Sequence, residues 1–187
     1  LVEPGVLDKA LDTVSPQPVV AIVEQSSASL ESLPLDRPVL MLVDVRDPGN
    51  MGTLIRTAEA SGCAGVVLAG SCVDPSNPKV VRSSAGSWLR TPIVELPDAV
   101  ETLAVLSAQS RPTLAAALVS GAVEMWHADL GRAVIVLGNE AHGLSPEVVE
   151  ACDAAVIIPF DGPTESLNVG VAGALLAFEG LRQRRKL

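Results

Sequence analysis

Short apolar runs alternate with amphipathic stretches along most of this chain, from about residue 38 onward. The runs are built from Val, Leu, Ile and Ala, a composition typical of strands that are buried on both faces. We expect strands at residues 39–43, 65–68, 113–118, 133–137 and 154–158, with a candidate sixth strand at 92–96. We expect helices at residues 50–61, 97–107, 145–151 and 165–185. The repeated order of strand, helix and strand predicts an α/β fold with a parallel sheet that helices cover on both faces.

Residues 1–37 have a different pattern. They hold several prolines and a serine-rich stretch at 26–32, and their single good strand signal is at 19–23. A short segment with one strand signal and several prolines cannot bury a core of its own. We therefore expect residues 1–37 to be the remnant of a preceding N-terminal domain followed by a linker, and residues 38–187 to form the α/β domain.

The three cysteines, Cys63, Cys72 and Cys152, lie far apart and show no metal-ligand spacing. We expect buried, reduced thiols and no metal site. The hydrophobic fraction is 48%, but no uninterrupted apolar run reaches the roughly 18 residues that a membrane span needs. With no secretory signal visible, these features predict a cytoplasmic protein without membrane contact.

The formal charge of −9 argues against a protein that binds nucleic acid through a broad basic face. Local charge matters more than the sum, because phosphates are neutralised only by the cations that reach them. Cations concentrate in two stretches: Lys79, Arg82 and Arg90 in the interior, and Arg182, Arg184, Arg185 and Lys186 near the C-terminus. The second group fits phosphate contact, and it fits a solvated helix end favoured by the helix dipole equally well.

The first segment with candidate chemistry follows the first core strand, at residues 44–56. Its sequence DPGN at 47–50 is typical of a turn, and Asn50 is a good N-cap for the following helix. Arg56 lies in the second turn of that helix, near the edge of the sheet where α/β proteins hold anionic substrates. Taken alone, Arg56 is better explained as an ordinary surface arginine.

The second segment, at residues 136–145, leads from a strand through a loop into a helix that Ser145 caps. Gly138 and Gly143 let the main chain approach a ligand closely, and exposed main-chain groups can bind an adenine edge. The spacing is not that of a dinucleotide-binding turn or a P-loop, which disfavours NAD and ATP. His142 invites a general-base role, but a lone loop histidine is more often structural or solvated.

The third segment, at residues 157–169, leads from a strand through a loop containing Pro and Gly to the last helix. Residues 164–168 open that helix with hydroxyl, carboxyl and amide side chains. Such side chains often only cap a helix, although a helix N-terminus is also where substrate anions bind.

Together and in this order, the three segments resemble the motifs of the SpoU (TrmH-like) family of SPOUT RNA 2′-O-ribose methyltransferases. The matching residues are Asn50, Gly52, Arg56 and Ala58 in the first motif, Gly138, Glu140, Gly143 and Leu144 in the second, and Ile158, Pro159, Ser166, Leu167, Asn168 and Val169 in the third. The resemblance covers about residues 38–183. The chain departs from the family at Gly170, where Ser is common, and this departure concerns helix packing and substrate positioning.

The resemblance implies an S-adenosylmethionine-dependent enzyme that methylates a ribose 2′-OH in RNA, with ribosomal RNA favoured over tRNA. It also implies a deep C-terminal trefoil knot, and a homodimer in which Arg56 of one subunit lies beside the cofactor of the other. The implied cofactor-binding residues are Gly138, Asn139, Ile158 and Leu167. The implied catalytic residues are Arg56, Asn50, Glu140, Ser166 and Asn168, with no metal.

By this resemblance, Arg56 has two alternative roles. A ribose hydroxyl is a very weak acid, so its attack on a methyl group needs proton removal or strong polarisation. An arginine is almost never neutral, so Arg56 can act as a base only with help from a phosphate or a neighbour, and electrostatic positioning explains it equally well. Asn50, Ser166 and Asn168 would orient the reacting groups, and Glu140 would order the loop.

Two other functions compete with this one. An inactive RNA-binding or ribosome-assembly protein of the same fold is suggested by the acidic charge and by Gly170. A Rossmann-type oxidoreductase is disfavoured because the Gly-rich dinucleotide turn is absent. Reading an RNA sequence needs surface beyond the α/β domain, and we expect the domain that ends within residues 1–37 to be this substrate-binding part.

Overall fold

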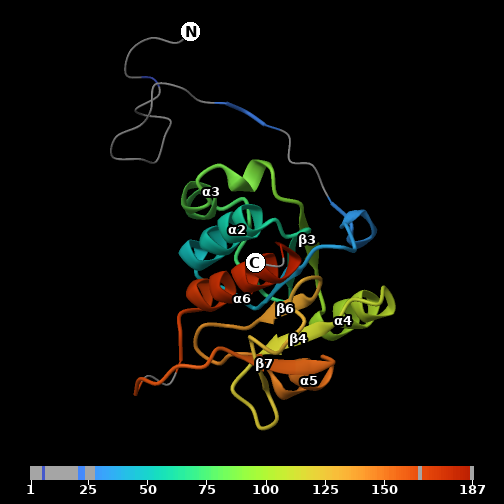
Figure 1. Cartoon of the computed structure of the whole chain (residues 1–187). Helices are drawn as coiled ribbons and strands as arrows, with labels where there is room; N and C mark the ends of the chain where they lie inside the picture. Colours follow the sequence, from blue (N-terminus) through green and yellow to red (C-terminus); the bar gives the residue numbers. More distant parts are fainter. Residues whose placement is uncertain (1–5, 7–20, 24–27, 164–165, 186–187) are drawn as a thin grey trace.

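A seven-stranded parallel sheet forms the centre of the fold, with strand order β3-β2-β1-β6-β4-β7-β5 (Figure 1). The computed structural model describes residues 6, 21–23, 28–163 and 166–185. The strands are β1 (Val39–Val43), β2 (Gly65–Ala69), β3 (Ile93–Leu96), β4 (Thr113–Ala116), β5 (Val123–Glu124), β6 (Val134–Leu137) and β7 (Ala154–Ile157).

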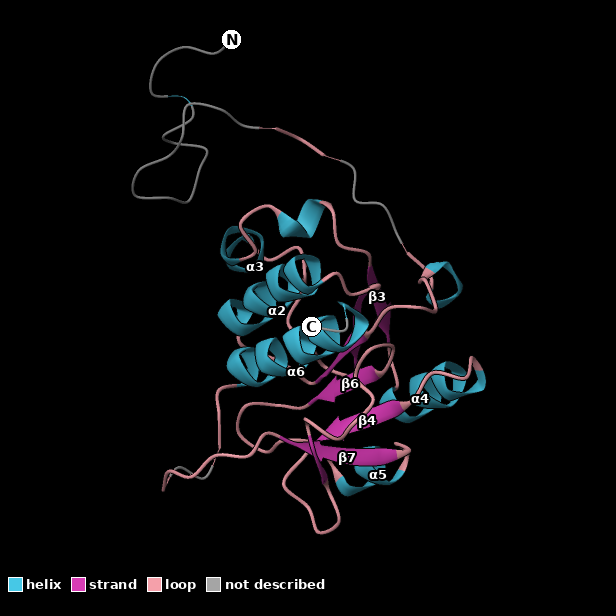
Figure 2. Ribbon diagram, viewed as in Figure 1, coloured by secondary structure: helices cyan, strands magenta, loops and turns pink. Residues whose placement is uncertain are grey.

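Helices cover both faces of this sheet (Figure 2). They are α2 (Pro48–Ser61), α3 (Pro78–Ser83), α4 (Ala99–Ala108), α5 (Pro146–Glu150) and α6 (Val169–Arg185), with 3₁₀ turns η1 (Leu30–Ser32) and η2 (Ser87–Leu89). One side carries α2, α3 and α6, and the other carries α4 and α5. The α/β class and the two-sided covering of a parallel sheet are confirmed.

The central strand β1 shows why continuous apolar runs appear in the sequence. All five of its residues are buried. Successive side chains of a strand point to opposite faces. Leu40 and Leu42 therefore pack in the core beneath α2 and α6, whereas Val39, Met41 and Val43 pack in the core beneath α4 and α5. A strand with helices on both faces has no solvent-facing position for a polar residue.

Several predicted boundaries differ from those in the structure. The strand predicted at 113–118 ends at Ala116, and the last helix begins at Val169, with the predicted start at Glu165 lying outside the described residues. The sequence did not predict α3, β5 or the two 3₁₀ turns. The strand predicted at 19–23 lies largely outside the described residues, and residues 21–23 are not in a strand.

The described part of the N-terminal segment, from residue 28, packs against the domain. Leu30 and Leu33 are buried in the core beneath α4. The buried guanidinium of Arg111 donates hydrogen bonds to the main-chain carbonyls of Leu33, Pro34 and Arg37, at 2.7, 2.7 and 3.0 Å. The chain therefore approaches β1 along a fixed path.

The three cysteines are free and only partly buried, where the sequence predicted buried thiols. Burial raises the pKa of each thiol, in the case of Cys152 to about 12. A thiol with a raised pKa forms little of the reactive thiolate. No helix among the described residues is long and apolar enough to cross a membrane.

Candidate active site

The three motif segments meet at one edge of the sheet. They follow β1, β6 and β7, and the carboxyl ends of parallel strands lie at the same edge. This edge is where open α/β sheets bind their ligands. The topology therefore brings together residues that lie more than 100 positions apart in the sequence, such as Asn50 and Asn168.

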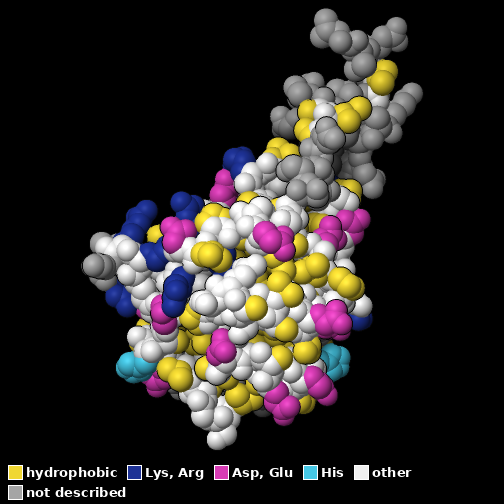
Figure 3. Space-filling view, turned by 90° about the vertical axis from the view of Figure 1, so that its right-hand side faces the viewer, with side chains coloured by type: hydrophobic (Ala, Val, Ile, Leu, Met, Phe, Trp, Pro, Cys, Tyr) yellow, Lys and Arg dark blue, Asp and Glu magenta, His cyan; other side chains and the backbone are white. Residues whose placement is uncertain are grey.

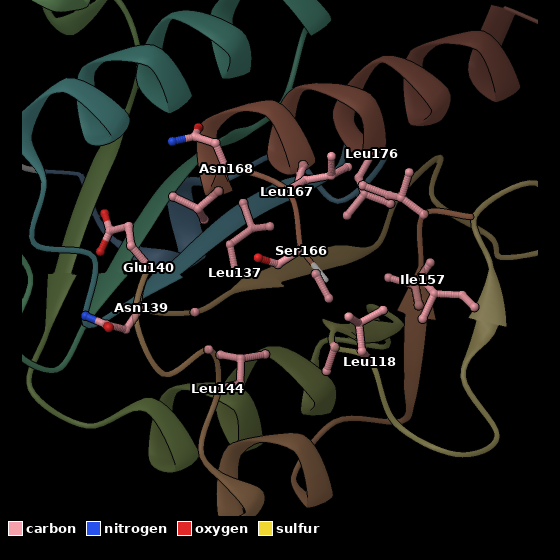
Figure 4. Close-up of a pocket in the computed structure, with 18 of the residues that line it drawn as sticks. Leu118, Leu137, Asn139, Glu140, Leu144, Ile157, Ser166, Leu167, Asn168 and Leu176 are labelled. Carbon is pink, nitrogen blue, oxygen red and sulfur yellow. The ribbon is translucent and has the colours of Figure 1, made fainter. Parts of the chain in front are cut away.

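A cavity of about 560 Å³ opens at this edge (Figure 4). It is lined by the four predicted cofactor-binding residues, Gly138, Asn139, Ile158 and Leu167, and by three predicted catalytic residues, Glu140, Ser166 and Asn168. Asn139, Glu140 and Asn168 lie toward one end of the cavity in Figure 4, and aliphatic side chains surround the rest. A cavity that combines apolar walls with several polar groups is typical of small-molecule sites.

Gly138 brings two parts of the loop into direct contact. A Cβ atom at this position would lie 2.4 Å from the carbonyl carbon of Gly143 and 2.5 Å from the nitrogen of Leu144. Both are main-chain atoms that cannot rotate away. Gly138 is therefore required for the loop to close on itself, and Gly143, with a φ of +68°, supplies the left-handed turn.

Asn139 holds the loop in shape through all of its polar atoms. Its main chain exchanges two hydrogen bonds with Gly143, at 3.1 and 2.9 Å. Its side-chain oxygen accepts from the nitrogens of Ala141 and His142, and its amide donates to the Asp44 carbonyl at 2.9 Å. Asn139 therefore shapes the cavity wall and ties the loop to the end of β1.

Glu140 connects the second motif to the first. Its carboxylate accepts hydrogen bonds from the main-chain nitrogens of Arg46 and Asp47, at 3.5 and 3.2 Å, and from the Asn50 amide at 3.1 Å. Partial burial raises the pKa of Glu140, but the hydrogen bonds from Asn50 and from the main chain outweigh this effect, and the net pKa is lowered. The carboxylate is therefore held in its charged form.

Asn168 connects the third motif to the same network. Its amide donates to the side-chain oxygen of Asn50 at 3.0 Å, and its own side-chain oxygen accepts from the nitrogens of Gly170 and Val171. Asn168 thus caps α6 and binds α2 at once. One continuous chain of hydrogen bonds, from Glu140 through Asn50 to Asn168, joins all three motifs.

Asn50 was wrongly predicted as the N-cap of α2. The cap is Asp47, whose side chain accepts a hydrogen bond from the Asn50 nitrogen at 2.7 Å. Pro48 can start the helix because the first helical position needs no N–H donor. This shift places Asn50 within the first helical turn, where its side chain is free to bind Glu140 and Asn168.

Arg56 lies apart from the cavity. It is exposed on α2, six residues beyond Asn50, which corresponds to about 9 Å along a helix. It does not line the cavity, and it has no hydrogen bond or ion pair with any residue that the structure describes. Eight of the nine predicted site residues thus line the cavity or bind residues that do, and Arg56 is the exception.

The C-terminal arginines are largely engaged in internal contacts. Arg182 pairs with the buried Glu179, with a shortest distance of 2.7 Å. Arg184 donates to the carbonyl oxygens of Ser61 and Gly62, at 2.7 and 3.3 Å, and so binds the C-terminal end of α2. These contacts favour a structural role for this group over phosphate contact, and Lys186 lies outside the described residues.

The profile of the SpoU rRNA Methylase family matches residues 37–178. This chain belongs to that family. It is 39% identical over 185 residues to an uncharacterized tRNA/rRNA methyltransferase of Synechocystis, covering 98% of this chain and 67% of the relative. It is 36% identical to the 23S rRNA (guanosine(2553)-2′-O)-methyltransferase RlmP of Bacillus subtilis, covering 89% of this chain and 66% of that relative.

Solved structures of the SpoU family share the fold. The SpoU methyltransferase AviRb from Streptomyces viridochromogenes, in complex with AdoMet, has a TM-score of 0.78 and 31% identity, over 87% of this chain and 67% of that one. An AdoMet-bound rRNA methyltransferase from Sinorhizobium meliloti has a TM-score of 0.77 and 32% identity, over 86% and 62%. This SpoU chain spans roughly two thirds of the length of the curated relatives that it matches in sequence.

Two features of this SpoU chain bear on its site. The cavity is also lined by residues 116–119, directly after β4, which the sequence did not single out. Their position at the carboxyl end of a predicted strand was the available signal.

At Gly170, a Cβ atom would lie 3.1 Å from the Asn168 oxygen and 3.3 Å from the Thr53 methyl group. The departure from the family thus lies where α6 contacts α2, beside the hydrogen-bond network.

Proposed function

We propose that this SpoU chain binds S-adenosylmethionine in the cavity and transfers its methyl group to a ribose 2′-OH in ribosomal RNA. The observation that carries the proposal is the cavity itself. Residues of the second and third motifs of this family line it, and hydrogen bonds from Glu140 through Asn50 to Asn168 hold these motifs in place. The relatives named as 23S rRNA 2′-O-methyltransferases and the neighbours solved with AdoMet support the same reaction.

The cavity fits this cofactor in size and chemistry. Its volume of about 560 Å³ lies within the range typical of cofactor sites. Leu137, Leu144 and Leu176 offer apolar walls to a nucleobase, and Gly138 lets the loop pack closely enough to form the neighbouring wall. The Glu140 carboxylate gives the polar end a negative charge, which suits a cationic ligand.

S-adenosylmethionine supplies, when bound, a methyl group on a positively charged sulfur. The residues of this chain would hold the ribose oxygen in line with that methyl group, which lowers the entropic part of the barrier. Ser166, at the cavity, would orient the ribose, and Asn168 would hold the segment that carries Ser166 in place through its bonds to Asn50 and to the start of α6. We assign Arg56 to electrostatic stabilisation and phosphate positioning, because a guanidinium is not deprotonated in proteins.

We propose a homodimer in which Arg56 of each subunit completes the partner's site. Two observations support it: the separation of Arg56 from its own cavity, and three half-exposed apolar side chains on α6, Val171, Leu175 and Phe178. Their spacing of four and three residues places them on one helix face. An exposed apolar stripe of this kind is typical of a protein–protein interface.

Mixed dimers test this shared site. Arg56→Ala and Gly138→Leu should each abolish methyl transfer, the first by removing the guanidinium and the second by forcing open the loop that forms the cavity wall. When the two variants are co-expressed, a mixed dimer holds one site with an intact cavity and an intact arginine, and activity should return. If Arg56 works within its own subunit, no mixture of the two variants regains activity.

The reaction itself is tested by calorimetry and by label transfer. The chain should bind S-adenosylmethionine and not a nicotinamide dinucleotide, and it should move tritiated methyl groups into ribosomal RNA in preference to tRNA. Cofactor binding without transfer to any RNA would instead support the inactive RNA-binding protein. Absence of S-adenosylmethionine binding would remove the methyltransferase function from this chain.

We also propose the finer structural features that the family resemblance implies. The C-terminal part forms a deep trefoil knot, which is supported by the crossovers in the sheet order β1-β6-β4-β7 and by the likeness to solved SpoU structures. Residues 1–37 are the end of a substrate-binding domain, and the protein works in the cytoplasm without a metal. A crystal structure that traces residues 158–185 unambiguously tests the knot.

A further inference from the structure

The Lys and Arg side chains that the structure describes form two groups: those that donate hydrogen bonds within the protein and those that do not. Figure 3 shows in dark blue those that lie on one face of the molecule. Internal partners occupy Arg90, which pairs with Glu59, as well as Arg111, Arg182 and Arg184. The other Lys and Arg side chains of the described residues are exposed: Arg37, Arg46, Arg56, Lys79, Arg82, Arg132 and Arg185. Among these, Arg46, Lys79 and Arg82 come from two segments that lie together beside the cavity.

Helix α3 is held firmly against the start of α2. A Cβ atom at Gly52 would collide with the Ser83 side chain and would lie 2.7 Å from the Val80 carbonyl, so the two helices touch at that glycine. The Ser83 hydroxyl donates to the Pro48 carbonyl at 3.2 Å, and Val80 is fully buried in the core. This packing leaves the other side of α3, with Lys79 and Arg82, exposed.

The same packing brings α3 to the edge of the candidate site. Lys79 Nζ lies 3.9 Å from Asp47 Oδ2, and Asp47 directly follows the exposed Arg46. The main-chain nitrogens of Arg46 and Asp47 both donate to Glu140, which lines the cavity. The segment of Arg46 and, through Asp47, Lys79 are therefore held beside the loop that lines the cavity, and Arg82 follows Lys79 by one helical turn on α3.

We propose that Arg46, Lys79 and Arg82 form a surface that binds the phosphate backbone of the RNA beside the reacting ribose. This inference rests on the proposed function. Two carboxylates lie beside these cations, and both are already engaged within the protein: Asp47 pairs with Lys79 and caps α2, and Glu140 accepts hydrogen bonds from the first motif. A locally positive surface lets a chain of charge −9 bind a polyanion.

A salt titration of RNA binding tests this surface. The chain of 187 residues is compared with its Lys79→Gln/Arg82→Gln variant, using deproteinised ribosomal RNA at about 50 to 200 mM salt. Loss of two phosphate contacts should weaken binding by about tenfold at low salt and flatten the slope of log K against log salt by about 1.4, or 0.7 for each contact. Arg46→Gln alone should flatten it by half as much.

The matched control removes two charges at the opposite edge of the sheet. Arg37 and Arg132 are exposed and stand before the amino ends of β1 and β6, so Arg37→Gln/Arg132→Gln changes the net charge equally. Its salt slope should stay that of the wild type. Equal slopes for both double variants would overturn the proposed surface. S-adenosylmethionine binding is measured in parallel and should stay unchanged in both double variants, since none of the four residues lines the cavity. Loss of the RNA-binding surface and loss of the proposed function are therefore distinguished.

Discussion

At the scale of single residues, the site depends on side chains that bind other parts of the protein rather than a ligand. Asn139, Glu140 and Asn168 line the cavity, yet their polar atoms hold the loop, α2 and α6 in place. Such residues keep the cavity in shape before any ligand arrives. Preorganisation of this kind reduces the cost of ordering the site on binding.

Glu140→Gln should weaken this bracing in a pH-dependent way. The amide that replaces the carboxylate places a donor against N–H donors, which should cost on the order of 1 kcal/mol of folding free energy, because the site is partly solvated. The pKa of Glu140 is lowered from its ordinary value of 4.5, so its charged form stabilises the fold above that pH and the effect is lost as pH falls below it.

Thermal unfolding of the wild type and Glu140→Gln across this pH range checks the prediction. The difference between the two melting temperatures should be full near neutral pH and should shrink in acid. A difference that stays constant through pH 4.5 would show that the charge of Glu140 contributes nothing.

Gly138→Ala should damage the cofactor site more than the fold. The added methyl group meets main-chain atoms of Gly143 and Leu144 at 2.4 to 2.5 Å, so the loop must open. We expect at least tenfold weaker binding of S-adenosylmethionine, equivalent to about 1.4 kcal/mol. Gly162→Ala is the matched control, because a Cβ there meets nothing within 4 Å, and its calorimetric affinity should equal that of the wild type.

At the scale of elements, α2 is fixed at both ends. Asp47 caps its start, and Arg184 of α6 binds the Ser61 and Gly62 carbonyls at its end. Because α2 also carries Asn50 and Arg56, its position sets the geometry of both the cavity edge and the exposed arginine. The C-terminal helix therefore contributes to the site through α2 as well as through its own residues.

Arg184→Ala should accordingly destabilise the fold without weakening RNA binding. The lost hydrogen bonds to main-chain carbonyls should cost about 1 to 2 kcal/mol, measured as a lower urea midpoint. Arg185→Ala, which removes an exposed neighbour of the same charge, should leave the midpoint unchanged. Weaker RNA binding by Arg184→Ala than by Arg185→Ala at equal folded fraction would contradict this structural role.

The elements that the sequence predicted are those with a local signal. Buried strands such as β1 and long helices such as α2 carry a clear hydrophobic pattern. By contrast, α3 has only six residues, too few to show a helical period, and β5 has two, which form a strand only because they pair with β7. The true cap Asp47 was missed because Pro48 and Gly49 suggest a turn, although Pro also begins helices.

The sequence indicated which residues gather at the cavity, but not which hydrogen bonds join them. Family motifs supplied Gly138, Asn139, Ile158 and Leu167, all of which line the cavity. The link from Glu140 to Asn50 joins residues 90 positions apart, and no local pattern records such a contact. Contacts of this range follow from the order of strands in the sheet, which the sequence pattern leaves open.

At the scale of the whole molecule, activity should depend on assembly. If α6 forms the dimer contact, Leu175→Asp/Phe178→Asp should place charges in the apolar interface and yield a monomer in light scattering. The monomer should still bind S-adenosylmethionine, since neither residue lines the cavity, but should transfer no methyl groups because Arg56 of the partner is missing. A fully active monomer would remove the shared site.

The wall of the cavity formed by residues 166–169, Ala172 and Leu176 follows all seven strands in the sequence. Because the first two motifs precede this wall in the sequence, a growing chain already carries them while its cavity lacks one side. A product that ends early, by a premature stop or by proteolysis before residue 166, has no complete site. Synthesis of α6 therefore completes the site, and a copy that stops before it has no closed cavity.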